Sequence, residues 1–303
     1  MAFSSLRALI GGGGGGGSSG NPYAIFGYGY AASNVSLTNK VDSSGVVATD
    51  TTGVGTARWG LGAAGYGTDK AIFGYGYTAS NVSLTNKVDS SGVVATDTTG
   101  VGTARSVLAA AGYGTDKAIF GYGDTGGATA LTNKVDSSGV VATDTAGVGS
   151  ARRYLAAAGY GTDKAIFGYG NTGSAGVSLT NKVDSSGVVA TDTTGVGTAR
   201  WTLTATGYGS GKAIFGYGTT GSRVSLTNKV DSSGVVATDT TGVGTARSFP
   251  AAAGYGLDKA IFGYGDPGST SSLTNKVDSS GVVATDTTGV GTARWGLAAA
   301  GYG

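Results

Sequence analysis

Few residues in this sequence are able to do chemistry. The chain has no cysteine and no histidine, and all 18 acidic residues are aspartates because glutamate is absent. Disulfides, thiolate or imidazole metal sites and cysteine nucleophiles are therefore excluded, and few side chains remain that could act as a general acid or base. The repeated aspartates, such as Asp42 and Asp50, lack the dense oxygen ligands of a calcium loop and fit a turn and a strand end better. We expect a protein that is not an enzyme and binds neither cofactor nor metal.

Charge and hydropathy narrow the classes of partner. Charged residues make up 13% of the 303 residues, and the formal net charge is +2, which gives no electrostatic reason to expect nucleic acid. No apolar run approaches the roughly 18 residues of a membrane span, and the amino terminus lacks the pattern of a secretory signal. The sequence predicts a soluble chain without membrane insertion.

The elements that position the remaining side chains come from an internal repeat. The string Ala-Ile-Phe-Gly-Tyr-Gly begins at Ala24, Ala71, Ala118, Ala165, Ala213 and Ala260, a period of 47 residues and once 48. Each copy favours four short strands, in the second copy over residues 61–66, 70–75, 83–88 and 93–98, joined by tight turns and without an amphipathic helix. Four-stranded units of about 40 to 50 residues are the signature of propeller blades.

The two ends of the repeat array complement each other. The chain enters the repeat at a second strand, residues 23–28, and leaves it after a first strand, residues 297–302. Pairing these strands would complete one blade and remove the free sheet edge. We therefore predict an all-β fold, a six-bladed β-propeller over residues 21–303 closed by its terminal strands. A linear β-solenoid is the alternative, although it has no need of complementary half-repeats.

The order of features in each copy resembles the kelch repeat. An arginine precedes a strand of small residues, a turn, a strand that ends in Phe-Gly-Tyr-Gly, and two further strands. Two departures are that Gly74-Tyr75-Gly76 stands where kelch repeats have adjacent glycines, and that the fourth-strand tryptophan is absent. Some kelch-type propellers hold copper with histidines and a cysteine-linked tyrosine, and this chain lacks histidine and cysteine. The string Lys-Ala-Ile-Phe-Gly-Tyr-Gly is also similar to tandem repeats of tail-fibre-like or other virion proteins of bacteriophages, which implies location in a virion.

Differences between copies gather in two segments, the loop between the second and third strands and the positions after the repeat arginine. In a meander blade both segments project onto one face, whereas the turns of the other face are nearly uniform. Such a pattern fits a diversified recognition surface, with aromatic side chains for contact area and polar ones for selectivity. Neutral drift in solvated loops is the alternative. The candidate ligand-binding residues are Tyr30, Trp59, Tyr77, Asp124, Arg153, Tyr154, Asn171, Trp201, Arg223, Phe249, Asp266 and Trp295.

Constant residues have mainly structural interpretations. The repeat arginines could ring a binding pocket, but an arginine at the same place in every blade fits better as a tie between a loop and its neighbour. The tyrosines of Gly-Tyr-Gly are expected to pack between blades, where glycine allows close approach of sheets. The repeat arginines are Arg58, Arg105, Arg152, Arg200, Arg247 and Arg294.

Residues 1–20 form a separate segment. Phe3, Leu6, Leu9 and Ile10 have near-helical spacing and precede seven consecutive glycines at 11–17. We predict an anchor peptide that docks into other virion proteins, followed by a glycine-rich linker. An untethered terminus is the alternative.

Together these features predict a non-enzymatic adhesion or display protein of a phage particle. Its diversified face would recognise a host surface glycan or protein. The alternative is a structural decoration or cement subunit whose loops contact neighbouring virion proteins. A hydrolase would have only unpaired loop aspartates, such as Asp124 and Asp266, to use.

Overall fold

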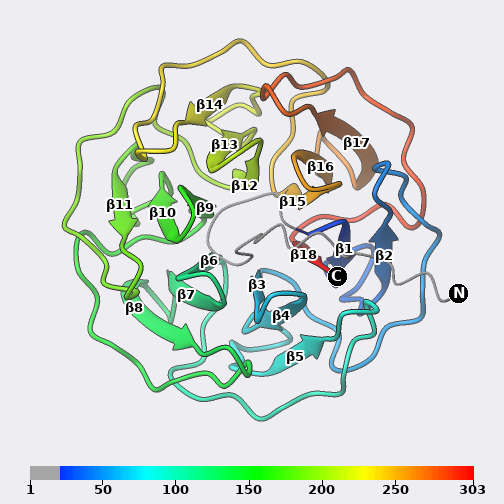
Figure 1. The fold of residues 1–303 in the computed structure, drawn as a ribbon, viewed down its shortest axis with the longest axis horizontal. Coiled ribbons are helices and arrows are strands. Elements are labelled where there is room, and N and C mark those ends of the chain that lie inside the picture. The colour runs from blue at the N-terminus through cyan, green and yellow to red at the C-terminus, as the bar shows by residue number, and fades with distance from the viewer. Residues whose placement is uncertain (1–20) are drawn as a thin grey trace, which may run out of the picture.

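The computed structural model describes residues 21–303, and these residues contain no helix, hence none able to cross a membrane. They form six three-stranded antiparallel sheets, an all-β architecture consistent with a propeller-like repeat. Figure 1 shows the sheets arranged around a common centre, with one strand of each sheet nearest that centre.

The strands occupy equivalent positions in every sheet. The innermost strands are β18 (Ala298–Tyr302), β3 (Gly62–Tyr66), β6 (Ala109–Tyr113), β9 (Ala156–Tyr160), β12 (Thr204–Tyr208) and β15 (Ala251–Tyr255). The middle strands are β1 (Tyr23–Gly27), β4 (Lys70–Gly74), β7 (Lys117–Asp124), β10 (Lys164–Gly168), β13 (Lys212–Gly216) and β16 (Lys259–Gly265). The outer strands are β2 (Thr38–Val41), β5 (Thr85–Val88), β8 (Ala128–Val135), β11 (Thr180–Val183), β14 (Thr227–Val230) and β17 (Ser271–Val277).

The core lies between neighbouring sheets, because the middle strands are apolar on both faces. In β4 the side chains of Ile72 and Phe73 are both fully buried. They point to opposite sides of the sheet, so Phe73 packs with Tyr28 of the preceding sheet and Ile72 with Phe120 of the following one. This explains why the middle strands read as continuous apolar runs rather than as alternating ones.

A glycine directly after the phenylalanine of each middle strand lets the sheets approach closely. A Cβ atom at Gly74 would stand 2.6 Å from the ring carbon Cζ of Phe120 in the next sheet. Any larger residue would push that ring out of the core. The equivalent glycines meet the equivalent phenylalanines all around the molecule.

The predicted fourth strand is wrong as a continuous strand. In the second copy, residues 93–98 pair with β5 only through two isolated bridges, Val88 with Val94 and Thr85 with Thr98. Between these bridges the outer segment has one residue more than β5, and the Asn86 side chain donates to the Ala95 carbonyl at 3.0 Å. A bulge and a side-chain bond therefore replace part of the regular ladder.

Contacts between sheets continue from the last copy to the first. The strand β1 pairs with β18 over five residues, from Tyr23 with Tyr302 to Gly27 with Ala298. At one end of the inner strands, the turn glycine of each copy donates its amide to a backbone carbonyl in the adjacent copy. The six bonds are Gly67 to Asp116, Gly114 to Asp163, Gly161 to Gly211, Gly209 to Asp258, Gly256 to Pro22 and Gly303 to Asp69.

Candidate recognition face

The two variable segments of the repeat lie side by side. The residue after each repeat arginine forms an isolated antiparallel bridge with the first residue of a loop between the middle and outer strands. These bridges are Tyr30 with Trp295, Trp59 with Tyr77, Ser106 with Asp124, Arg153 with Asn171, Trp201 with Thr219 and Ser248 with Asp266. Nine of the twelve candidate residues are thus in these bridges. We call the surface that carries these bridges the variable face.

Buried arginines hold this face in place. The Arg58 side chain is fully buried, and its Nε and Nη2 atoms donate to the Tyr75 carbonyl at 2.7 Å and to Asn86 Oδ1 at 2.6 Å. Its guanidinium carbon lies 4.4 Å from the ring centre of Tyr28 in the preceding sheet. All six repeat arginines are 0% exposed, so they tie loops to sheets and do not ring an accessible pocket.

Each arginine has an aspartate nearby. Arg58 Nη1 lies 3.7 Å from Asp97 Oδ1, and Asp97 also accepts hydrogen bonds from the backbone and hydroxyl of Thr56. Burial alone would raise the pKa of Asp97, but hydrogen bonds from Thr56 and Asn86 and the Arg58 charge outweigh it and lower the pKa. Burial lowers the pKa of Arg58, against the opposing effects of Tyr28 and Asp97.

A cycle of backbone hydrogen bonds surrounds the centre of the variable face. The second residue after each arginine donates its amide to the carbonyl of the equivalent residue in the preceding copy, at 2.6 to 3.2 Å. The cycle runs Val107 to Gly60, Tyr154 to Val107, Thr202 to Tyr154, Phe249 to Thr202, Gly296 to Phe249 and Gly60 to Gly296. We call these six residues the axial ring.

All axial-ring residues have a left-handed backbone. Gly60 and Gly296 adopt φ of 64° and 65° at little steric cost, whereas Val107 and Thr202 adopt 49° and 55° despite their branched Cβ. Sequence reasoning singled out Tyr154 and Phe249 but missed the ring itself. The signal that could have revealed the ring is the second position after the arginine, which is glycine in two copies and a larger residue in the other four.

Six aromatic side chains meet around the axial ring. Trp295 lies at the middle of the cluster, with ring centres 5.0 Å from Trp59, 5.1 Å from Phe249 and 5.1 Å from Tyr30. Tyr77 joins through Trp59 at 5.8 Å, and Tyr154 joins through Phe249 at 5.7 Å. All six side chains are partly exposed. The structure therefore brings together six of the twelve predicted ligand-binding residues, which we call the aromatic cluster.

The charged candidate residues are paired with one another. Arg153 forms an ion pair with Asp124, and Arg223 Nη2 lies 2.9 Å from Asp266 Oδ2. Both pairs join neighbouring copies. The description of Asp124 and Asp266 as unpaired aspartates is therefore wrong, because each carboxylate already has a cationic partner.

Two other candidate residues lie apart from the aromatic cluster. Trp201 covers Gly176, whose added Cβ atom would stand 2.6 Å from the indole ring. Asn171 holds its own loop, because its Oδ1 atom accepts the Gly173 amide at 2.6 Å. Neither side chain has a ring contact with the aromatic cluster among the interactions found for residues 21–303.

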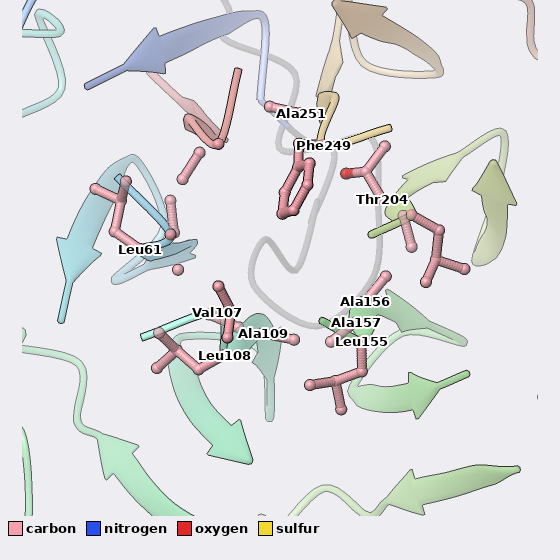
Figure 2. Close-up of a pocket in the computed structure, with 18 of the residues that line it drawn as sticks. Leu61, Val107, Leu108, Ala109, Leu155, Ala156, Ala157, Thr204, Phe249 and Ala251 are labelled. Carbon is pink, nitrogen blue, oxygen red and sulfur yellow. The ribbon is translucent and has the colours of Figure 1, made fainter. Parts of the chain in front are cut away.

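A cavity of about 110 Å³ lies inside the axial ring and is shown in Figure 2. The six ring residues line its outer part, and the small side chains of the inner strands line its deeper part. A second cavity of about 110 Å³ opens from the opposite end and shares the middle alanines, such as Ala63 and Ala110. Figure 2 shows Phe249 extending into the first cavity and the Thr204 oxygen facing it.

The aspartates of the opposite face form turns. Asp42 Oδ1 accepts the amides of Ser44 and Val46 at 2.8 and 2.9 Å, as the predicted turn requires. Across residues 21–303, no group of three or more acidic, cysteine or histidine side chains is placed to hold a metal ion. The predicted anchor residues Phe3, Leu6, Leu9 and Ile10 lie outside the described residues. No protein-family model and no curated protein sequence matches this chain.

Proposed function

We propose that residues 21–303 form a closed six-bladed kelch-like β-propeller. Support comes from the pairing of β1 with β18 and from two cycles of hydrogen bonds, one at each end of the inner strands. Each cycle visits all six copies and returns to its start. In a linear solenoid the first and last copies would have no such bonds to each other.

We propose that this propeller is a non-enzymatic adhesion or display protein of a phage particle that recognises a host surface glycan or protein. The observation that carries the proposal is the concentration of differences between copies on the variable face. The opposite face repeats Asp-Ser-Ser-Gly in all six copies, for example at 42–45 and 89–92. A surface that diversifies while its scaffold stays uniform is typical of recognition.

The chemistry of the variable face suits this role. Partly exposed indole and phenol rings give rigid contact area at low entropic cost. Location in a virion rests on the resemblance of the repeat to tail-fibre-like proteins. Residues 1–20 would anchor the chain to other virion proteins, and many copies on one particle would raise avidity without a tight single site.

The test is binding of the full chain, displayed in many copies on fluorescent beads, to an array of glycans and to bacterial cells. A variant with Trp59, Trp201 and Trp295 changed to alanine should lose binding at least tenfold. The matched control changes Ser44, Ser91 and Ser138 on the opposite face to alanine and should bind as the parent chain does. Equal binding by both variants would show that the variable face does not bind the ligand.

A structural cement subunit is the second candidate, and exposed valines favour it. One valine of each outer segment is 57% or 58% exposed in every copy, a large exposure for an aliphatic side chain. These are Val46, Val93, Val140, Val188, Val235 and Val282. If the rim contacts neighbouring virion proteins, changing three of these valines to aspartate should abolish incorporation into particles while leaving bead binding unchanged.

A further inference from the structure

We propose that the axial ring and its cavity form the ligand site of the variable face, and that the ligand is an uncharged pyranose at the end of a glycan chain. This inference rests on the proposed recognition function and makes it specific. It assigns the ligand to the centre of the face rather than to the outer loops, and it adds Val107, Thr202 and Thr204 to the site.

One side of the site is aromatic. Phe249 contacts both Trp295 and Tyr154, with ring centres 5.1 and 5.7 Å apart, and extends into the cavity in Figure 2. Trp59 borders the lining rather than forming part of it: its indole packs against the lining residue Gly296, where a Cβ atom would lie 3.2 Å from the ring. Partly exposed rings of this kind can stack on the apolar C–H face of a sugar.

The other side of the site has hydroxyl groups. Thr204 stands at a position where the other five copies have glycine or alanine, and its oxygen faces the cavity in Figure 2. Tyr154 and Thr202 also line the cavity, and the Thr202 hydroxyl donates to the Trp201 carbonyl at 2.6 Å, which leaves its oxygen able to accept. Burial raises the pKa of Tyr154, more than the Arg153 charge lowers it, which keeps its hydroxyl protonated and able to donate. Rings on one side and hydroxyls on the other match the two kinds of surface of a pyranose.

The backbone of the site is strained where side chains enter it. Val107, Tyr154, Thr202 and Phe249 adopt φ between 49° and 56°, a conformation that costs most residues about 1 kcal/mol or more. Gly60 and Gly296 show that glycine fits this position without that strain. Four copies therefore place side chains at the cavity against a backbone preference, and strain of this kind gathers at functional sites.

The charge and shape of the cavity further limit the classes of ligand that it can bind. The residues that line the cavity are all uncharged, and the charge of Arg153, next to the lining residue Tyr154, is already paired with Asp124, although its buried Nε atom has no hydrogen-bond partner. A carboxylate entering the cavity would lose water without gaining a cation, which is unfavourable. The cavity opens at the centre of the ring of sheets and measures about 110 Å³, below the roughly 300 Å³ of ordinary small-molecule pockets, so that only part of a sugar ring enters it. The end of a glycan fits this geometry better than an internal residue with neighbours on both sides.

The experiment uses the three tryptophans of the full chain as reporters. Their indole N–H signals are assigned by single Trp→Phe changes and followed during titration with methyl glycosides of galactose, glucose, mannose and N-acetylglucosamine. At least one of these should shift the Trp59 and Trp295 signals, with a Kd in the range of about 1 mM, and leave Trp201 unchanged. Glucuronic acid and sialic acid should produce no shift at the same concentrations.

Two variants that the chain itself suggests test the residues. Phe249→Gly removes the ring and gives this position the glycine of Gly60 and Gly296, so the fold should be retained. Thr204→Ala gives β12 the residue found in β6, β9, β15 and β18. Each variant should bind the glycoside that shifts the tryptophan signals at least tenfold more weakly. Ser91→Ala, in an Asp-Ser-Ser-Gly turn of the opposite face, is the control and should leave the affinity unchanged.

The outcomes separate this inference from the proposed function. If the beads bind cells or glycans but no glycoside shifts the Trp59 and Trp295 signals, the axial-ring site is overturned and the proposed recognition function is not. Preference for a charged sugar, a shift confined to Trp201, or binding of N-acetylphenylalanine amide in place of a sugar also overturns this site. If glycosides bind at the axial ring but the beads attach neither to cells nor to arrays, the site is supported and the adhesion function is contradicted.

Discussion

The guanidinium of Arg58 is buried, yet all three of its nitrogens have hydrogen-bond partners. Besides Tyr75 and Asn86, its Nη1 atom donates to the Thr56 carbonyl at 3.0 Å. Thr56 belongs to the segment that crosses from one sheet to the next, so the arginine fixes that crossing. The Nη2 bond to an asparagine recurs in all six copies, whereas the buried Nε atoms of Arg152 and Arg247 have no hydrogen-bond partner.

Replacing Arg58 with methionine should destabilise the protein by about 3 kcal/mol, because an apolar side chain leaves Asn86 Oδ1 and two carbonyls without donors. Urea unfolding followed by circular dichroism measures this change. Arg223→Met is the matched control, since its ion pair with Asp266 is at the surface and should cost less than about 1 kcal/mol. Similar losses in the two variants would show that burial of Arg58 contributes little.

Residue roles that depend on the repeat alone could be predicted, whereas roles that depend on neighbouring copies could not. The turn formed by Asp42 follows from local sequence, since its carboxylate accepts amides two and four residues later. The aromatic cluster joins Tyr30, Trp59 and Phe249, which come from the first, second and last copies. Only the arrangement of sheets around the centre brings them within ring contact.

Among the elements, the outer segment differs most from its prediction. Residues 93–98 are Val-Val-Ala-Thr-Asp-Thr, a pattern rich in the β-branched residues typical of strands, and two bridges place the segment beside β5. The pattern could not reveal the extra residue between the bridges, because the bulge depends on the Asn86 side chain reaching the Ala95 carbonyl. In the second copy the inner and middle strands, which have regular partners on one or both sides, agree with the predicted ranges to within one residue.

The outer segments should exchange their amide hydrogens faster than the middle strands. In the second copy only Ala95 and Thr98 of the outer segment donate to β5, at 2.8 Å each, whereas β4 has partner strands on both sides. Hydrogen exchange followed by mass spectrometry, averaged over the six copies, should show peptides from the Val-Val-Ala-Thr-Asp segment labelled well before those from Ala-Ile-Phe-Gly. Simultaneous labelling would mean that each sheet opens as one unit.

For the whole molecule, repetition multiplies every local effect by the number of copies. Burial raises the pKa of Tyr28, Tyr75, Tyr122, Tyr169 and Tyr217 to about 12, although the arginine stacked on each ring opposes the rise. A phenol whose pKa is higher in the folded state favours folding below the unfolded value of 10.0 and loses that contribution as the pH rises through about 12.

Stability should therefore fall steeply and cooperatively between pH 10 and 12, because the buried phenols must ionise together when the chain unfolds. Absorbance at 295 nm, which follows phenolate, and circular dichroism should change over the same narrow range. Tyr75→Phe should broaden or shift this transition slightly, since one of the equivalent phenols is removed. Ionisation of all tyrosines near pH 10 without unfolding would contradict the expectation.

The pairing of β1 with β18 also determines how the molecule responds to force. Tyr23 and Tyr302 are direct partners at one end of an antiparallel pair. A pull that separates these two residues opens the hydrogen bonds one after another, as in unzipping, and meets little resistance. A load that enters at residue 23 and leaves through the axial ring crosses several strands instead, where many bonds share it. If the chain is anchored on its amino-terminal side, as proposed, the pull does not act between these two strand ends, and the pairing of β1 with β18 is not unzipped.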